Sequence, residues 1–223
     1  MIKYTNINGK SVTSQQVEML KEYKIQTFDD TSGKIKKIES VRLKRGNIPF
    51  TFFEYYLEPS ENKTQIIQQY TDQIKDHRLG IYLNKQSANG FDLWDYESYD
   101  NNGNLFVKKK FVYDIQGRMI LNLTIDTQTN EITNHSEYFP TKYYYGTALD
   151  TANGLPNLEL EFRFKFDTDI NQFVTYIKDI NGTTGEIHTM NVNEFIELFG
   201  QAFWDSHPYY HSVLPFLPTS ANI

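Results

Sequence analysis

The stretch LFVKKKFVYDIQGRMILNLTI, residues 105–125, decides the fold class of this chain. Two runs rich in apolar residues flank Asp114-Ile-Gln-Gly117, in which an Asp caps a turn and a Gly accepts a positive φ angle. From Met119 to Ile125 apolar and polar residues alternate, with Ile120 as the exception, so this segment has one apolar face. The stretch therefore predicts a β-hairpin that packs one face against a core.

The same turn signal occurs six times, which predicts that most of the chain folds as hairpins. Each copy has an Asp, small polar residues, a Gly or Asn and then an apolar residue, and the copies begin at Asp30, Asp100, Asp114, Asp126, Asp167 and Asp179. Segments that alternate apolar and polar residues lie between the turns. They predict strands at residues 35–43, 49–57, 79–84, 91–99, 105–113, 118–125, 131–139, 158–166, 172–178 and 186–190.

Helical periodicity occurs in three segments, residues 13–23, 62–77 and 192–204. We therefore expect an α+β fold, with a large antiparallel β-meander of about ten strands and about three helices packed on one face. No Pro- or Ser-rich linker interrupts the sequence, so residues 1–223 are predicted to form a single domain. The loop at residues 150–156 is the alternative boundary, because Asn-Gly and Pro mark a turn there.

Composition restricts the function classes. The 223 residues include 22 Lys and Arg against 28 Asp and Glu, a net charge of −6, and no cysteine. Without Cys the chain has no disulfide, no thiol nucleophile and no Cys-ligated metal centre, which suits a reducing compartment. The first residues form no apolar signal segment, and no run of about 18 apolar residues occurs, so we expect a cytoplasmic protein with no membrane partner.

Enzyme motifs do not occur in the sequence. The chain has no G-x-S-x-G elbow, no G-x-x-x-x-G-K-[ST] phosphate loop, no H-E-x-x-H helix and no dinucleotide fingerprint. A pair of catalytic carboxylates leaves no spacing signature, so that class of site stays open. We expect no catalytic residue and no cofactor.

Metal sites are weakly indicated in two places. Residues 167–171 match the first positions of a calcium loop, but Gln172 and Lys178 stand where such a loop needs Gly and Glu, so a hairpin turn is expected. His207 and His211 could ligate a metal from one helix face with a nearby Asp, but a proline interrupts the helix. We therefore expect no bound metal.

Nucleic-acid binding is not expected either. The only basic runs are Lys34-Ile-Lys36-Lys37 and Lys108-Lys109-Lys110, and both lie on predicted strands. Lysines there are typical of a protected sheet edge, and the negative net charge opposes binding to phosphates.

The C-terminal third is the most acidic part of the chain. Residues 141–223 carry 10 Asp and Glu against 4 Lys and Arg. The difference, −6, equals the net charge of the whole chain. The predicted helix at 192–204 holds Glu194 and Glu197, and Asp205 follows it. These carboxylates form either a solvated helix face or an acidic surface that attracts a basic partner.

Aromatic residues and prolines crowd the segment that follows. Residues 204–218 include Trp204, Tyr209, Tyr210 and Phe216 together with three prolines. One interpretation is an extended segment that packs over the sheet and closes the core. The other is a rigid aromatic anchor for a partner, because Tyr and Trp concentrate binding energy at low entropic cost.

Two hairpin units carry a family resemblance. Tyr99-Asp-Asn-Asn-Gly-Asn-Leu105 and Tyr113-Asp-Ile-Gln-Gly-Arg-Met119 resemble the Tyr-Asp…Gly-Arg-Leu repeats of Rhs-type toxin shells and of MORN-variant antitoxin-like proteins. A shell needs many copies, so this chain is not a shell. In its size, acidity, aromatic content and lack of catalytic motifs the chain resembles bacterial immunity proteins, which bind and neutralise a cognate toxin of type VI secretion, contact-dependent inhibition or Rhs systems.

The resemblance implies an immunity protein whose partner is a cognate protein toxin, a nuclease or another basic enzyme, with its active site occluded. The residues expected to bind the partner are Glu194, Glu197 and Asp205 for electrostatic steering, and Trp204, Tyr209 and Tyr210 as anchors. The alternative is a small-molecule or carbohydrate-binding module or hydrolase that uses a concave sheet face lined by Tyr, Trp and acids. A purely structural role, marked by self-association, is the third hypothesis.

Overall fold

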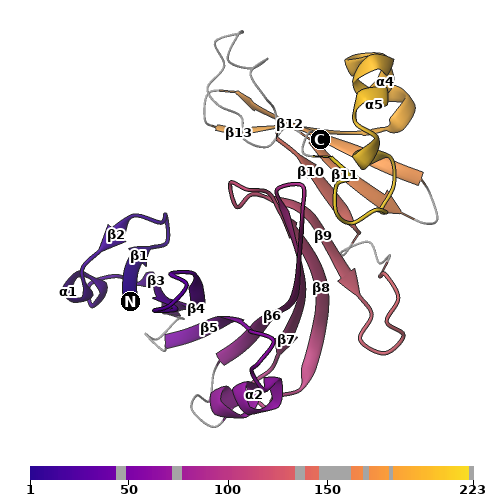
Figure 1. The fold of residues 1–223 in the computed structure, drawn as a ribbon. Coiled ribbons are helices and arrows are strands. Elements are labelled where there is room, and N and C mark those ends of the chain that lie inside the picture. Colours follow the sequence, from indigo (N-terminus) through magenta and orange to yellow (C-terminus); the bar gives the residue numbers. More distant parts are fainter. Residues whose placement is uncertain are drawn as a thin grey trace. The chain divides into compact units, whose positions relative to one another are not determined.

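Strands make up most of the structure, a computed structural model that describes residues 1–43, 49–71, 77–133, 139–145, 162–167, 171–180 and 183–220. Within these residues one sheet contains thirteen strands: β1 Ile2–Asn6, β2 Ser11–Val12, β3 Glu22–Phe28, β4 Ile35–Leu43, β5 Pro49–Tyr56, β6 His77–Ala88, β7 Phe91–Tyr99, β8 Leu105–Tyr113, β9 Met119–Ile125, β10 Thr141–Tyr144, β11 Phe162–Asp167, β12 Asn171–Ile180 and β13 Thr183–Asn191. The helices of the same residues are α1 Ser14–Val17, α2 Lys63–Thr71, α4 Val192–Phe199, α5 Gln201–Ser206 and a short 3-10 helix, η1 Pro208–His211 (Figure 1). The fold is mostly β with a few short helices, which is broadly consistent with the predicted α+β class.

The strands follow the order β13-β12-β11-β10-β9-β8-β7-β6-β5-β4-β3-β1-β2, so neighbours in sequence are mostly neighbours in the sheet. Among the pairs with a described register, β5 and β6 run parallel, with Phe53 opposite Leu79. A parallel pair needs a crossover connection, and α2 lies on the connection between these two strands. The sheet therefore departs here from the expected antiparallel meander, and it has more strands than expected.

The N-terminal region differs most from the sequence prediction. The segment 13–23, expected as one helix, contains only the single turn of α1, and β3 begins at Glu22. Thr13 caps α1, because its hydroxyl accepts the N–H of Gln16 at 3.2 Å and its own N–H donates to the Gln16 side chain at 2.9 Å. The helix ends early because β3 pairs with β1 on one side and β4 on the other, and these ladders outweigh a weak helical period.

Other differences are smaller. Strands β1, β2 and β10 were not predicted, and the strand predicted at 131–139 is only an isolated bridge between Ile125 and Ile132 in its described part. The remaining predicted strands form within a few residues of their expected bounds wherever they are described. Short strands such as β10 carry too few alternating residues for the pattern to be detected.

The Asp turn signal forms as predicted at Asp100, Asp114 and Asp126. At the Asp114 turn, Oδ1 accepts the N–H groups of Gln116 at 2.9 Å and Arg118 at 2.8 Å, and Gly117 has φ 77°. The other two turns have the same pattern of bonds from N–H groups to the Asp Oδ1.

The first copy of the turn signal needs a correction, because the capping residue is Asp29 and not Asp30. Asp29 Oδ1 accepts the N–H groups of Thr31 at 3.0 Å and Ser32 at 2.6 Å. Asp30 instead pairs with the N-terminal amine at 2.7 Å. The copies at 167 and 179, and with them the calcium-like segment, extend into residues 168–170 and 181–182, which lie outside the described residues.

Acidic pH is expected to weaken the fold through these turns. Backbone N–H groups, chiefly those of Asn104 and Thr129, lower the pKa values of the Asp100 and Asp126 carboxyls. A carboxyl with a lowered folded-state pKa stabilises the fold above its unfolded pKa of about 4, and this contribution is lost as pH falls through the folded pKa. In the variant Asp100→Asn/Asp126→Asn, each Asn keeps one side-chain oxygen that can accept the N–H bonds of the turn, but neither side chain titrates. We expect its free energy of unfolding in urea to decline less than that of the wild type between about pH 5 and pH 2. Identical declines would contradict this assignment.

The chain divides into two compact units, Met1–Asn84 with Asp95–Lys108 (unit 1) and Lys85–Trp94 with Lys109–Ile223 (unit 2). The expected alternative boundary at 150–156 lies outside the described residues, so the number of domains stays a prediction, as does a common face for all helices. None of the described helices is long and apolar enough to span a bilayer.

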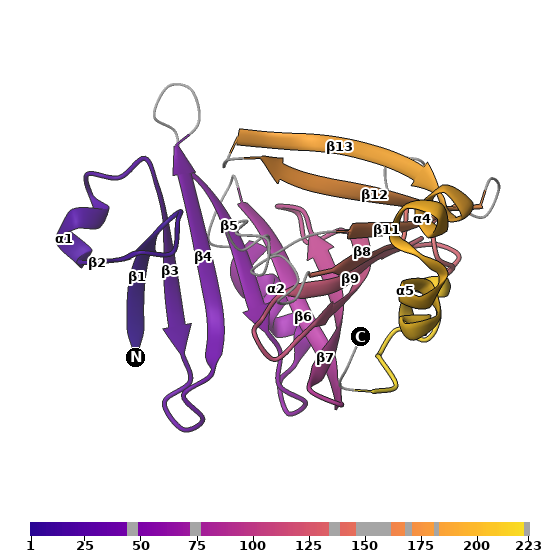
Figure 2. The ribbon, with the colours of Figure 1, turned by 90° about the horizontal axis from the view of Figure 1, so that it is seen from above.

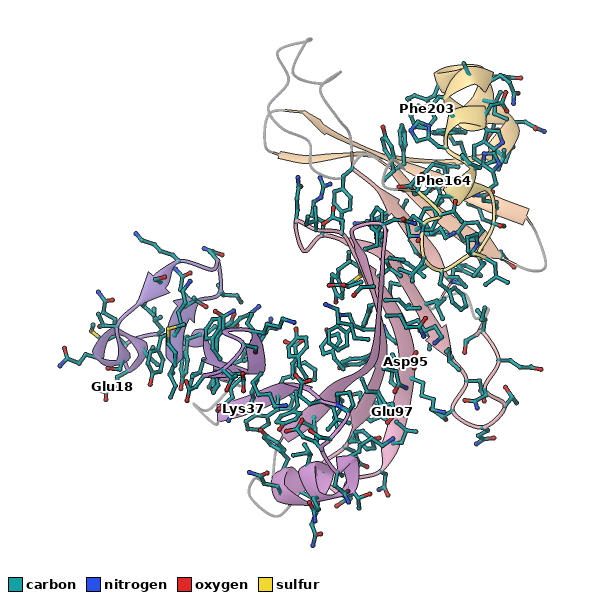
Figure 3. All side chains as sticks on the ribbon, viewed as in Figure 1. Glu18, Lys37, Asp95, Glu97, Phe164 and Phe203 are labelled. Carbon is teal, nitrogen blue, oxygen red and sulfur yellow. The ribbon has the colours of Figure 1, made fainter. Side chains whose placement is uncertain are left out.

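Unit 1 has a core between its sheet and α2. The buried residues are Phe53, Tyr70, Leu79, Ile81 and Tyr99, of which only Tyr70 comes from α2. An ion pair of 2.7 Å joins Lys63 Nζ on α2 to Glu97 Oε2 on β7. Figure 3 labels Glu97.

Unit 2 has the larger core, rich in Phe and Tyr. Its members come from β7 to β13, from α4 and from the C-terminal segment, and they include Leu121, Tyr144, Phe162, Phe164, Val174, Phe195 and Tyr210. Helix α4 contacts β12 and β13 (Figure 2). Of the predicted partner-binding residues, Tyr209 and Tyr210 belong to this core, and the others lie on α4 and α5 beside it.

Candidate functional site

The predicted helix at 192–204 is two short helices, α4 and α5. Asn191 begins α4, because its side chain accepts the N–H of Glu194 at 3.0 Å and its own N–H donates to Glu194 Oε2 at 2.8 Å. Helix α4 ends at Gly200, whose φ of 93° is one that side chains rarely adopt. The period of the apolar residues continues across this break, which explains why the sequence predicted one helix.

Aromatic side chains fix which face of these helices points inward. Phe195 has no exposed surface, and its ring centroid lies 5.1 Å from that of Phe162 and 5.6 Å from that of Phe164. Phe203 of α5 lies 5.8 Å from Phe162, and Figure 3 labels it above Phe164 in the same cluster of side chains. Edge-to-face contacts of this kind hold the helices in one orientation on β11.

The outer face carries the predicted acidic residues. Glu194, Glu197 and Leu198 are exposed on α4, with Leu198 at 69%. Asp205 is exposed on α5, where its Oδ1 accepts a hydrogen bond of 2.8 Å from Gln201 Nε2. Residues 192–206 contain no Lys or Arg, so no cation of these helices offsets the three carboxylates. We call Glu194, Glu197, Leu198 and Asp205 the acidic face.

Trp204 lies partly inside the core. Its ring stacks on His211 with centroids 4.1 Å apart and also lies 6.0 Å from Phe195. The side chain is half-buried, so only part of it is available to a partner.

Tyr209 and Tyr210 are not surface anchors, contrary to the sequence prediction. Only 6% of Tyr209 and 1% of Tyr210 is exposed. The ring of Tyr210 lies 4.7 Å from Phe164 and 5.7 Å from Tyr144, so it belongs to the core of unit 2. The alternative interpretation, in which this segment packs over the sheet and closes the core, is confirmed for these residues.

The two histidines of this segment cap backbone groups. His207 Nδ1–H donates to the Phe203 carbonyl oxygen at 2.7 Å, and His211 Nε2–H donates to that of Trp204 at 2.8 Å. Both carbonyls belong to the last turn of α5, where the Trp204 oxygen also accepts the backbone N–H of His207 at 3.1 Å. Among the described residues no three His, Asp, Glu or Cys side chains assemble around a common point for a metal.

Lys142 is a residue that the sequence analysis missed. It lies on β10 with no exposed surface, and its Nζ donates to the carbonyl oxygens of Tyr209 at 2.7 Å, Ser212 at 2.8 Å and Pro215 at 3.0 Å. The ammonium also lies 3.7 Å from the centroid of the Tyr209 ring. Burial lowers its pKa, while the three carbonyl oxygens act in the opposite direction because they accept hydrogen bonds from the charged form.

A second cluster of polar and aromatic residues lies in unit 1. Tyr82 donates its hydroxyl to Glu54 at 3.1 Å and stacks on Tyr56, with ring centroids 4.7 Å apart. Burial raises the pKa of the Glu54 carboxyl. A carboxyl with a raised pKa can hold or release a proton closer to neutral pH, which is a property of many functional sites.

Three of the predicted partner-binding residues are exposed, Glu194 and Glu197 on α4 and Asp205 on α5. Trp204 lies at the border of the core, and both tyrosines lie inside it. Leu198 is also exposed on α4. Its exposure was indicated by the sequence, because residue 198 falls outside the apolar stripe of Val192, Phe195, Ile196, Phe199 and Phe203. No family model and no curated protein matches this chain, so its function has to be inferred from its own geometry.

Proposed function

We propose that this chain is an immunity protein that binds a basic protein toxin through the acidic face and occludes the toxin's active site. The observation that supports the proposal is the exposure of three carboxylates and of Leu198 on two consecutive helices that contain no Lys or Arg. Carboxylates at the rim accelerate encounter with a positively charged partner, while an exposed leucine supplies apolar area for the centre of an interface.

Rigid support makes this surface suited to binding. Phe195 and Phe203 seat both helices on β11, and the capping box holds the first turn of α4. A surface that is ordered before binding loses less conformational entropy when a partner docks. The same reasoning applies to the part of Trp204 that remains exposed.

The functional test is protection of cells. Co-expression of this chain with the product of the adjacent reading frame should restore growth if that product carries the cognate toxic domain. A chain that binds no toxic domain encoded next to it, and that restores growth in no such pair, is not an immunity protein.

Charge removal on the acidic face is expected to slow association. The variant Glu194→Gln/Glu197→Lys removes negative charge, and Gln at position 194 can still complete the capping box. We expect an association rate on the order of 10-fold lower at low salt, with a smaller difference at high salt, because screening weakens steering. Surface plasmon resonance against the toxic domain measures the association rate at low and at high salt.

Glu197→Lys alone and Glu18→Lys form a matched pair, because each raises the net charge by two. Glu18 is exposed at the end of α1 in unit 1, and Figure 3 labels it. Its reversal alters the net charge but leaves the acidic face intact. Equal slowing by both variants would show that net charge, and not this face, controls association.

A small-molecule or carbohydrate-binding function is the second candidate, supported by Glu54 among tyrosines in unit 1. Stacked Tyr rings beside a carboxyl offer both an apolar surface and a hydrogen-bonding group. A thermal-shift screen with a panel of oligosaccharides tests it. A ligand that raises Tm in the wild type and not in Glu54→Gln would favour this candidate over the first.

A further inference from the structure

The C-terminal segment, residues 207–218, contacts the core of unit 2 without being described as a strand of the sheet. We call it the strap. It begins with η1 and continues as irregular backbone through Pro215 and Pro218. Its side chains Tyr209 and Tyr210 lie in the core, and Phe216 and Leu217 pack against it.

The carbonyl oxygens of the strap accept hydrogen bonds from other parts of unit 2. In the described hydrogen bonds of this kind, the donors are side chains and not the backbone N–H groups of a neighbouring strand. Asn89 donates to the Pro218 oxygen at 3.1 Å, and Gln172 donates to the Tyr210 oxygen. Lys142 alone donates three bonds, to Tyr209, Ser212 and Pro215. One lysine therefore contributes more bonds to the strap backbone than the other two donors together.

The chemistry of the Lys142 contact explains why a lysine stands at a fully buried position. An ammonium has three N–H donors and no acceptor, and three carbonyl oxygens surround it at 2.7 to 3.0 Å. Loss of the ammonium would leave these acceptors without their partner, and buried acceptors without partners are costly. In the β10 register Lys142 lies opposite Leu121 of β9 and Phe164 of β11, so its backbone is fixed by both neighbours.

We propose that the strap can open as a separate unit while the sheet stays folded, and that hydrogen bonds from Lys142 on β10 hold it closed. On opening, the strap leaves β9 to β12 paired and brings Tyr209 and Tyr210 to the surface. A segment that is held by side-chain packing and side-chain hydrogen bonds, and by no described strand ladder, can open at a lower free energy than the paired strands beneath it. This inference does not depend on the proposed function, because it concerns the fold of unit 2 alone.

Native-state hydrogen exchange of the wild-type chain tests this opening without any substitution. We expect the amides of Tyr209 and Tyr210 to exchange through a local opening whose free energy does not change with low concentrations of urea, whereas the amides of β10 and β11 exchange through unfolding. Exchange of strap and sheet amides at one common free energy would overturn the proposal.

Lys142→Met tests the role of the lysine. Methionine keeps most of the volume of the side chain and removes all three donors. We expect strap amides to exchange about 100-fold faster than in the wild type while the sheet amides keep their rates, since hydrogen bonds donated by a charged group are stronger than those between neutral groups. Unchanged strap rates, or equal acceleration of strap and sheet, would overturn the proposal.

Lys165→Met is the matched control. Lys165 lies on β11 beside the buried Phe164 and Phe166, so strand alternation points it to the other face of the sheet. It removes the same charge and should leave strap exchange unchanged.

Chemical rescue separates the missing ammonium from general damage. Lys142→Ala leaves a space that the atoms of propylammonium match. Propylammonium chloride should slow strap exchange in this variant, and sodium chloride at equal ionic strength should not. Equal effects of the two salts would overturn the assignment of the three carbonyl oxygens as an ammonium site.

Discussion

Phe195→Ala is expected to lower the free energy of unfolding of unit 2 by about 3–5 kcal/mol. The side chain has no exposed surface, and its ring lies 5.0 Å from Phe199, 5.1 Å from Phe162 and 5.7 Å from Phe203. Truncation removes buried apolar area and leaves a cavity that these rings cannot fill without losing their mutual contacts. Guanidinium denaturation followed by fluorescence measures the loss.

Leu198→Ala is the control for this substitution on the same helix. Leu198 is 69% exposed, so its removal should change stability by no more than about 0.5 kcal/mol. On the proposed function it should instead weaken toxin binding, because it removes the apolar centre of the acidic face. Equal destabilisation by the two substitutions would show that α4 is not held on the sheet by Phe195.

The local part of the fold was predictable from the sequence because it depends on local chemistry. The turns at Asp100, Asp114 and Asp126 need an acceptor side chain and a residue with positive φ, and both are visible as residue types. Long segments rich in apolar and aromatic residues between turn signals, such as β7 and β8, were predicted with the bounds that the structure shows. Their pattern repeats often enough to exceed chance.

Features that depend on tertiary contacts were not predictable. The helix predicted at residues 13–23 extends into the first two residues of β3, which instead pair with β1 or β4. Lys142 is a charged residue whose three acceptors lie 67 to 73 positions away in the sequence. No local pattern can show that such a lysine is buried.

The candidate site shows the same division between local and tertiary information. The exposed position of Glu194 and Glu197 follows from the helical period, which assigns Phe195 and Phe199 to the opposite side. The burial of Tyr209 and Tyr210 depends on how the strap returns to Tyr144 and Phe164, and residue type gave no information on it. The exposure of the carboxylates could therefore be predicted from the sequence, whereas the burial of the tyrosines could not.

Gly80→Ala is the second substitution with a large expected effect, about 3 kcal/mol of destabilisation in unit 1. A Cβ at this position would overlap the Tyr96 ring, and would lie 2.6 Å from Cε2 and 2.8 Å from Cζ. Tyr96 is only 8% exposed and packs edge-on against Tyr82 at 5.0 Å, so its ring has little room to move. Gly80 lies on β6 between buried Leu79 and Ile81, and a shift of the strand would disturb both.

A double-mutant cycle with Tyr96→Leu isolates the steric cause. Away from a clash, Ala in a strand is at least as favourable as Gly, so Gly80→Ala should cost little once the aromatic ring is replaced. We expect a coupling free energy of about 2–3 kcal/mol between the two positions, measured by urea denaturation of the four proteins. Additive effects would mean that Gly80 is required for backbone conformation and not for the close approach of Tyr96. Since the φ of Gly80 lies outside the positive range that favours glycine, the close approach of the ring is the only constraint on this residue that the structure shows.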